Sequence, residues 1–318
     1  MTRRETMRIW LVQIRSNFLA LAVLLTALGL ALAALDLKRE GMLDGFSALN
    51  AFLVILGVVL AHVSVNLFNE YSDHKTGIDS ATVRTPFSGG TGMIQSGKTT
   101  PVAVSTAAWQ TLFMAFLIGL YFAIMSHWII LVIMAVGGAS IVLYTRHFAR
   151  VLLGEFFAGL SLGSLVVIGT YVAMTAIPGA DPGTLFPTRV ILIAIPPGIL
   201  TSLLLFLNEF PDAEADRAGG RFHLVIFLGK RRAAYLYVVG LLAVYASIII
   251  LPVLGYFSWI SLLGLLTMPL AAKAAVTALR HAEDTPQLVP ALGLNVIVVL
   301  ATDLLLTIAV VLEIMGVA

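Results

Sequence analysis

Two short polar motifs of one pattern, Asn-Glu-aromatic-x-Asp, each follow a long apolar segment. The first spans residues 69–73 and the second spans residues 208–212, and each is followed by a further aspartate, Asp79 or Asp216. Carboxylates are scarce, with 17 Asp and Glu among 318 residues, yet seven of them lie in these two clusters. Mg²⁺ is usually held by one or two carboxylates together with substrate phosphates. The two clusters therefore predict a site for a divalent metal ion and a diphosphate.

The candidate metal ligands all carry oxygen donors and come from both motifs: Asn69, Asp73, Asp79, Asn208, Asp212 and Asp216. The four aspartates are also the candidate catalytic residues. In the second cluster, a spacing of four residues places Asn208, Asp212 and Asp216 in one stripe on a helix. Pro211 is expected in an early helical turn or at a kink. Gly77 is expected to end the helix that carries the first motif.

Basic residues beside the clusters can bind phosphate oxygens through charge-assisted hydrogen bonds. The candidates are Lys75, Arg84, Arg146 and Arg221. Arg84 precedes a segment with three glycines between positions 89 and 92, which permits a close approach of the backbone to a ligand. We expect this segment to fold over the diphosphate, with Arg84 on a phosphate oxygen. The metal would stabilise the departing diphosphate, and an allylic carbocation would form in an apolar chamber that excludes water.

Several polar residues lie within the apolar segments, where ionisable groups are functional candidates. Asn66 is three residues before the first motif and is expected to line the same cavity. Glu155, near the start of an apolar segment, fits either the substrate pocket or a structural pair. No role is assigned to four further residues: Glu70, His62, Glu209 and Asp303.

The composition predicts an all-α, polytopic membrane protein. The chain is 59% hydrophobic and 11% charged, with a mean hydropathy of +1.00, whereas soluble domains carry about 25% charged residues. The absence of cysteine excludes disulfides and thiolate metal sites. A spanning helix needs about 20 mainly apolar residues. Nine segments meet this need: about 18–35, 48–68, 101–123, 127–144, 153–175, 188–208, 233–254, 257–276 and 291–312.

The distribution of positive charge predicts the orientation. With the N-terminus in the cytoplasm, sixteen of the nineteen Lys and Arg residues lie on the inside, in accordance with the positive-inside bias. The C-terminus is then outside, and both acidic clusters lie on the cytoplasmic side of a cell (inner or plasma) membrane. We expect a single domain over 1–318, in which nine helices surround a central cavity. A weak internal repeat is expected, with units of about 15–150 and 151–290.

The paired motifs resemble those of the UbiA-type intramembrane prenyltransferases. Members carry an Asn-Asp-x-x-Asp-x-x-x-Asp-like motif and a later Asp-x-x-x-Asp on a nine-helix fold, and residues 69–79 and 208–216 correspond to these motifs. Within the family, the chain resembles the 1,4-dihydroxy-2-naphthoate polyprenyltransferase branch of menaquinone biosynthesis. The resemblance lies in the spacing within 69–79, the pair Tyr144-Thr145 and the run 153–155. This resemblance adds Tyr144 to the candidate substrate-binding residues.

Three departures from that branch bear on the acceptor and the metal. Glu70 stands where the branch usually has Asp, which lengthens the reach and could shift the metal preference. Arg146 and His147 occupy positions where glycines are common, and residues 221–223 replace a Lys-Arg-Thr-like run.

The resemblance implies an Mg²⁺-dependent transfer of a polyprenyl group from polyprenyl diphosphate to an aromatic acceptor, 1,4-dihydroxy-2-naphthoate. Another acceptor such as 4-hydroxybenzoate, or terpene cyclisation, stays open on the same fold. A metal or solute transporter is a distant alternative. Transporters place their binding residues near the bilayer midplane, whereas both acidic clusters here are expected at the cytoplasmic ends of the helices. The expected partners are the two substrates and the lipid bilayer, and no basic, aromatic-rich surface indicates nucleic acid.

Overall fold

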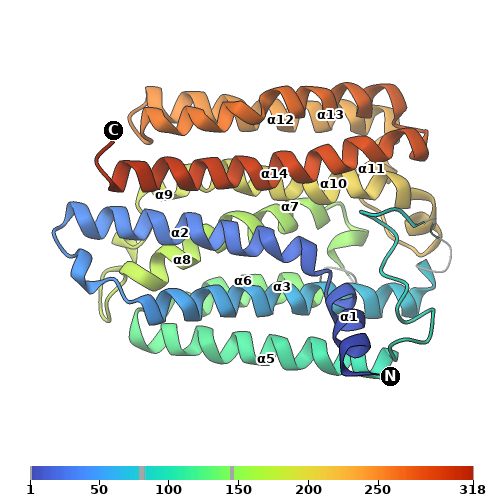
Figure 1. Ribbon diagram of the computed structural model, residues 1–318, viewed down its shortest axis with the longest axis horizontal. Coiled ribbons are helices and arrows are strands. Elements are labelled where there is room, and N and C mark those ends of the chain that lie inside the picture. The colour runs from blue at the N-terminus through green and yellow to red at the C-terminus, as the bar shows by residue number, and fades with distance from the viewer. Residues whose placement is uncertain (1, 79–81, 83, 144–146, 318) are drawn as a thin grey trace.

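The protein is an elongated bundle of long helices that run side by side (Figure 1). The structure, a computed structural model, describes residues 2–78, 82, 84–143 and 147–317. Within that part every regular element is helical. The α-helices are α1 (Arg3–Gln13), α2 (Leu19–Arg39), α3 (Ala48–Thr76), α5 (Pro101–Met125), α6 (Ile129–Leu143), α7 (Gly154–Gly159), α8 (Leu165–Thr175), α9 (Thr188–Ile193), α10 (Ile195–Ala218), α11 (Leu224–Leu228), α12 (Lys230–Val253), α13 (Met268–His281) and α14 (Thr285–Ile314).

Each of the nine predicted apolar segments coincides with helical structure. Among the described residues, eight helical segments are long and apolar enough to cross a bilayer, and the ninth, α6, is a shorter apolar helix of 15 residues. A π-helical turn, Leu160–Ser164, joins α7 to α8 within one span. The predicted all-α, polytopic membrane architecture is confirmed.

Local sequence signals set several helix ends. Thr100 caps α5 by accepting a hydrogen bond from the Ala103 amide at 3.2 Å, and Pro101 occupies the first turn. Gly77 ends α3 with a φ of 78°, a left-handed conformation that glycine adopts without strain. By contrast, α10 continues through Pro211 to Ala218. Because α3 and α10 both run beyond the predicted apolar segments, both polar motifs lie on helices.

The centre of the bundle is held by close packing around α2 and α10. Helix α2 packs against α8 and α14, and α10 packs against α7, α12 and α14. The backbones of α7 and α10 approach so closely that a Cβ on Gly159 would lie 2.6 Å from the carbonyl oxygen of Gly198. A Cβ on Gly163 would lie 2.8 Å from the Gly198 Cα. These glycines bring the end of α7 and the π-helical turn against the first turn of α10.

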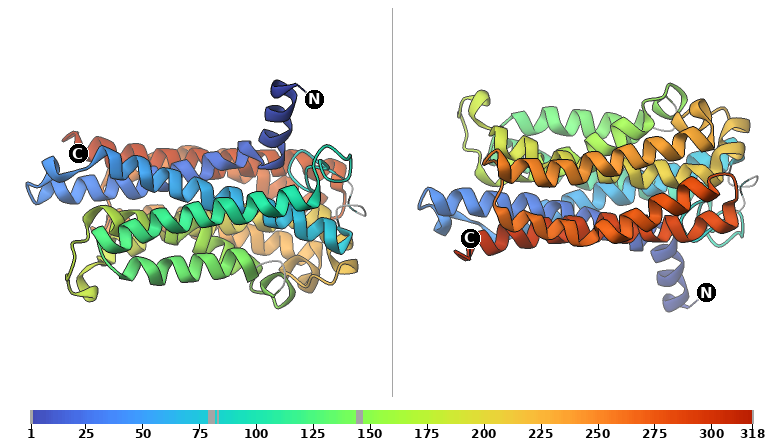
Figure 2. Two further views of the ribbon diagram at one scale, coloured as in Figure 1. Left: turned by 90° about the horizontal axis from the view of Figure 1, so that it is seen from below. Right: turned by 90° about the horizontal axis from the view of Figure 1, so that it is seen from above.

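The two ends of the bundle differ in their polar groups. The polar ends of α3 and α10 lie at the same end of the bundle, beside α11 and the segment that precedes α5 (Figure 1). Helix α1 stands out from the bundle at this end (Figure 2). At the opposite end, near the C-terminus, Asp36 forms an ion pair with Arg189 at 2.5 Å, and Arg39 forms one with Glu313 at 2.5 Å. The polar motifs are therefore gathered at a single end.

Candidate active site

One arginine connects the two acidic clusters. The Arg221 guanidinium donates to the Oδ1 of Asp216 at 2.8 Å and forms an ion pair with Asp73. Asp73 comes from the last turns of α3 and Asp216 from the last turns of α10, and Arg221 lies in the turn after α10. The fold thus brings together carboxylates from both motifs, as the sequence predicted.

A small cavity is lined by both motif helices and has polar side chains on part of its wall, so we call it the polar cavity. Its volume is about 160 Å³, and its lining includes Asn69 and Asn208, one from each motif, together with Asn66 and Arg15. Asn66 also donates to the Ile14 carbonyl oxygen at 2.9 Å. Asn66 therefore lies beside the motif asparagines in the wall of this cavity, and its part in substrate binding stays a prediction.

A much larger apolar cavity adjoins the polar one. It has a volume of about 690 Å³ and is lined by side chains of α3, α5, α6 and α8. His62, Ile141 and Leu162 line both cavities, so the two share a wall. His62 donates a hydrogen bond from Nδ1 to the Val58 carbonyl oxygen at 3.0 Å, while its buried Nε2 has no hydrogen-bond partner in the described part of the chain. The combination offers a polar head site beside an apolar chamber.

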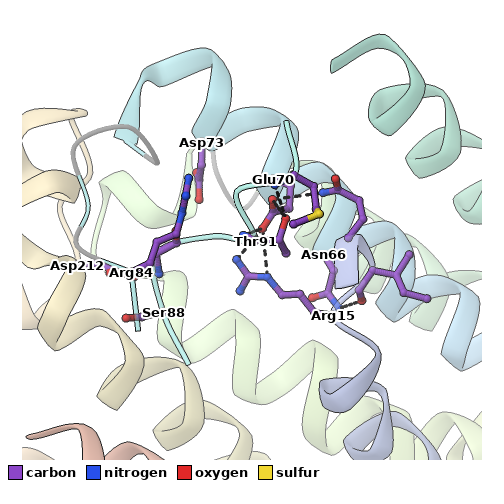
Figure 3. A network of polar contacts seen from close by, with 12 residues as sticks. Arg15, Asn66, Glu70, Asp73, Arg84, Ser88, Thr91 and Asp212 are labelled. Atoms are coloured by element: carbon purple, nitrogen blue, oxygen red, sulfur yellow. Dashed lines mark hydrogen bonds and ion pairs between the residues drawn. The ribbon is translucent and has the colours of Figure 1, made fainter. Parts of the chain in front are cut away.

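Glu70 anchors the glycine-rich segment to the bundle (Figure 3). Its carboxylate accepts hydrogen bonds from the Thr91 amide and hydroxyl, both at 2.8 Å. It also forms an ion pair with Arg15 at 2.9 Å and accepts a hydrogen bond from the Gln13 side-chain amide at 3.3 Å. Because these contacts engage both carboxylate oxygens, Glu70 holds three chain segments together rather than adding a ligand to the acidic clusters.

The glycine-rich segment also reaches the second motif. The Gly89 amide donates to the Oδ2 of Asp212 at 3.3 Å, and Gly89, Gly90 and Gly92 all have left-handed φ angles between 70° and 82°. The Arg84 side chain folds along this segment, donating from Nε to the Gly89 carbonyl oxygen at 3.2 Å. A Cβ on Gly92 would lie 2.5 Å from an Arg84 guanidinium nitrogen, so a larger residue there would displace the end of this arginine.

The oxygen donors of the second motif fit a hard divalent cation. The buried Oδ1 atoms of Asn208 and Asp212 have no hydrogen-bond partner among the described residues. Unsatisfied oxygens in a buried place are costly, and Mg²⁺ takes oxygen ligands of these types. Asn69 and Asp73 supply the same donor types from the facing helix.

The remaining predicted site residues lie in different places. Asp79, Tyr144 and Arg146 lie outside the described residues. Lys75 is exposed, with its ammonium group 5.7 Å from the centre of the Tyr71 ring. Glu155 is buried, and its Oε1 accepts from the Leu224 amide at 2.7 Å, so it lies in a structural cluster rather than in the described lining of either cavity.

Sequence reasoning did not find two residues of the site. Arg15 was counted only as an inside positive charge, and His223 only as a departure from the family pattern. In the structure Arg15 binds Glu70 and lines the polar cavity, and His223 contacts Asp216 at 3.2 Å. No local spacing signals either contact, because each joins segments whose proximity depends on helix packing.

Asp303 is fully buried in α14, and neither of its side-chain oxygens has a hydrogen-bond partner among the described residues.

In the described part of the chain, eight membrane-length apolar helices, the shorter α6 and the paired acidic motifs at one end define a polytopic membrane protein with a polar site. The sequence pattern of the UbiA prenyltransferase family matches residues 22–295. This chain therefore belongs to the UbiA prenyltransferase family, and the enzyme class predicted from the motifs is confirmed.

Two relatives carry the name of the 1,4-dihydroxy-2-naphthoate branch, which the spacing within residues 69–79 resembles. The 1,4-dihydroxy-2-naphthoate octaprenyltransferase of Bacillus subtilis is 32% identical over 192 residues, which cover 56% of this chain and 58% of the relative. The Escherichia coli enzyme of the same name is 28% identical over 286 residues, which cover 86% of each chain. The alignment thus spans less than two thirds of the first relative and most of the second.

Solved structures of the family share the fold. A UbiA homolog from Aeropyrum pernix K1 aligns with a TM-score of 0.67 and 17% identity, over 91% of this chain and 97% of that one. A UbiA homolog from Archaeoglobus fulgidus bound to DMAPP and Mg²⁺ aligns with a TM-score of 0.53 and 13% identity, over 94% and 98%. At these identities the likeness concerns the fold.

Proposed function

We propose that this chain transfers a polyprenyl group from polyprenyl diphosphate to 1,4-dihydroxy-2-naphthoate, in a reaction that depends on Mg²⁺. The observation that carries the proposal is the pair of adjoining cavities. One has the motif asparagines and other polar side chains on part of its wall, and the other is apolar with a volume of about 690 Å³. A prenyl diphosphate has the same two parts, a charged head and a long apolar tail. The curated relatives named 1,4-dihydroxy-2-naphthoate octaprenyltransferase support the choice of acceptor.

The residues that would hold Mg²⁺ are the motif oxygens, Asn69 and Asp73 on α3 and Asn208, Asp212 and Asp216 on α10. We include Asp79 in this set on the motif pattern alone. When bound there, the ion would supply positive charge that stabilises the diphosphate as it leaves. The Archaeoglobus fulgidus homolog was solved with DMAPP and Mg²⁺, which supports this assignment.

The chain's own residues perform the other tasks. Arg221, placed between Asp73 and Asp216, can exchange a carboxylate for a phosphate oxygen when the head group enters, and Lys75, Arg84 and Arg146 are further candidates for phosphate contacts. The bond between the allylic carbon and its oxygen breaks with the electron pair left on the diphosphate. The resulting carbocation is shielded from water by the apolar wall until a carbon of the acceptor ring attacks it. When the new carbon–carbon bond has formed, that ring carbon releases its proton, or its carboxylate as CO₂, and the ring regains its aromaticity.

A product assay tests this function. Membranes that contain the protein are incubated with labelled polyprenyl diphosphates, Mg²⁺ and a panel of acceptors, and the products are identified by mass spectrometry. A prenylated naphthalene derivative is expected with 1,4-dihydroxy-2-naphthoate. Preferential prenylation of 4-hydroxybenzoate would replace the acceptor, and a cyclised hydrocarbon formed without any acceptor would replace the reaction.

Arg84 provides a prediction about the diphosphate site. Loss of a charge-assisted contact costs about 1.5–3 kcal/mol, so Arg84→Ala should reduce kcat/KM for the prenyl diphosphate by roughly tenfold to hundredfold. The apparent affinity for the acceptor should stay nearly unchanged. Kinetics with each substrate varied in turn measure both effects, and Lys98→Ala, which removes an exposed cation of the same segment, is the control. A defect confined to the acceptor would move Arg84 out of the diphosphate site.

We also propose that the site end of the bundle faces the cytoplasm of a cell membrane, with the C-terminus outside. The positive-inside distribution supports this orientation. Single cysteines at the exposed positions Ser96 and Ala218 should resist an impermeant thiol reagent in intact cells and react after lysis. Exposed Thr184 belongs to the segment between α8 and α9, which lies at the opposite end of the bundle (Figure 1). A cysteine at this position should react in intact cells. The reverse pattern would invert the topology.

A further inference from the structure

Three buried side chains converge behind the acidic clusters, away from the described lining of both cavities. They are Glu155 of α7, Glu209 of α10 and His223, which precedes α11, and they are 2%, 6% and 1% exposed. One donor atom from each lies within 4.8 Å of the other two. These residues come from three elements, so the cluster exists only in the folded chain.

The free atoms of this cluster point at one another. The Oε2 of Glu155, the Oε2 of Glu209 and the Nδ1 of His223 are buried and have no hydrogen-bond partner among the described residues. The Oε1 of Glu155 is engaged, because it accepts from the Leu224 amide at 2.7 Å. His223 Nε2 lies 3.2 Å from the Oδ2 of Asp216. Donation from Nε2 to this carboxylate leaves a lone pair on Nδ1 that faces the two glutamates.

Such an arrangement is costly unless its negative charge is compensated. Burial of two adjacent carboxylates is unfavourable unless a cation or a proton compensates their charge. Arg221 contacts Asp216 through Oδ1 and reaches on to Asp73, on the side of the acidic clusters. The nitrogen and carboxylate donors of the cluster match a divalent transition metal such as Mn²⁺, Fe²⁺ or Zn²⁺.

Two geometric details agree with a metal ion. His223 Nδ1 and Glu209 Oε2 are 3.4 Å apart, which is close to the roughly 3.4 Å between ligand atoms at tetrahedral bond lengths of about 2.1 Å. Metal-binding histidines usually donate their second ring nitrogen to a carboxylate or carbonyl, which fixes the ring. Asp216 is in that position relative to His223.

We propose that Glu155, Glu209 and His223 form a second metal site, selective for a divalent transition metal and separate from the Mg²⁺ and diphosphate site. Asp216 connects the two, because its Oδ2 orients His223 and its Oδ1 binds Arg221. The ion would hold α7, α10 and the segment before α11 together beneath the acidic clusters. This inference does not rest on the proposed function, since its test measures metal binding directly.

The test exploits the nitrogen ligand. Purified protein is stripped with a chelator, loaded with Mn²⁺ and desalted in excess Mg²⁺, which competes at the oxygen-only site. Metal content is measured by mass spectrometry, and coupling of the bound Mn²⁺ to ¹⁴N is measured by pulsed electron paramagnetic resonance. We expect one retained Mn²⁺ per chain with a ¹⁴N coupling, because the acidic clusters offer only oxygen donors.

Variants separate the two sites. His223→Gln should abolish the ¹⁴N coupling, and Glu155→Gln, which keeps an oxygen for the Leu224 amide, should weaken Mn²⁺ binding by at least about tenfold. Asp73→Asn in the acidic clusters and Glu214→Gln, an exposed carboxylate on α10, should retain both the ion and the coupling. Size-exclusion chromatography and circular dichroism verify that each variant is folded. Wild-type protein that retains no Mn²⁺, or that shows no ¹⁴N coupling, would overturn the site, as would a coupling that persists in folded His223→Gln.

Discussion

Asp212→Asn is expected to reduce turnover by about two to three orders of magnitude, the size of effect seen when one preorganised electrostatic contact to a transition state is removed. The substitution takes away a negative oxygen from the predicted metal site. It still leaves an acceptor for the Gly89 amide, which contacts Asp212 at 3.3 Å. The loss of activity should therefore come from the metal and diphosphate chemistry rather than from a displaced glycine-rich segment.

The measurement is the prenyl-transfer rate at saturating Mg²⁺, with EDTA-treated wild-type protein as the metal-free reference. Asp73→Asn, on the facing helix, should show a defect of similar size. Glu214→Gln, an exposed carboxylate on the same helix as Asp212, should be nearly fully active. Wild-type turnover in EDTA, or in either aspartate variant, would refute a metal site built from both motifs.

Glu70→Ala should destabilise the protein and lower its activity together. Removal of one partner of a buried ion pair costs about 3–5 kcal/mol, and the lower end applies because the Arg15 side chain is 27% exposed while that of Glu70 is fully buried. The variant also removes both acceptors of the Thr91 amide and hydroxyl. The segment that reaches Asp212 would then lose its anchor.

Thermal unfolding in detergent, followed by tryptophan fluorescence, measures the change in Tm. Thr91→Val removes the hydroxyl contact to Glu70 and the acceptor of the Met93 amide but keeps the Thr91 amide bond to Glu70, so it should give a smaller decrease. Glu70→Asp should lie in between because its side chain is one methylene shorter. A Glu70→Ala protein with wild-type Tm and reduced activity would instead indicate that Glu70 acts in the reaction. In that case our structural assignment of Glu70 would be wrong.

The sequence by itself determined the architecture and the chemical class of the site. Hydropathy is a local property, so all nine apolar segments could be predicted, and Gly77 marked the end of α3 because a left-handed residue there favours glycine. The repeated motif identified the oxygen donors, because Asn, Asp and a fixed helical spacing suffice to define one polar face.

The tertiary structure alone decided which side chains meet. Arg221 bridges two helices whose motifs are far apart in the chain, Glu70 joins Arg15 to Thr91, and Glu155, Glu209 and His223 converge from three elements. These contacts depend on how closely helices approach, as where the backbone of Gly163 nearly touches Gly198. Close approach is a property of packed surfaces rather than of local spacing, so no pattern within a single segment could have predicted these contacts.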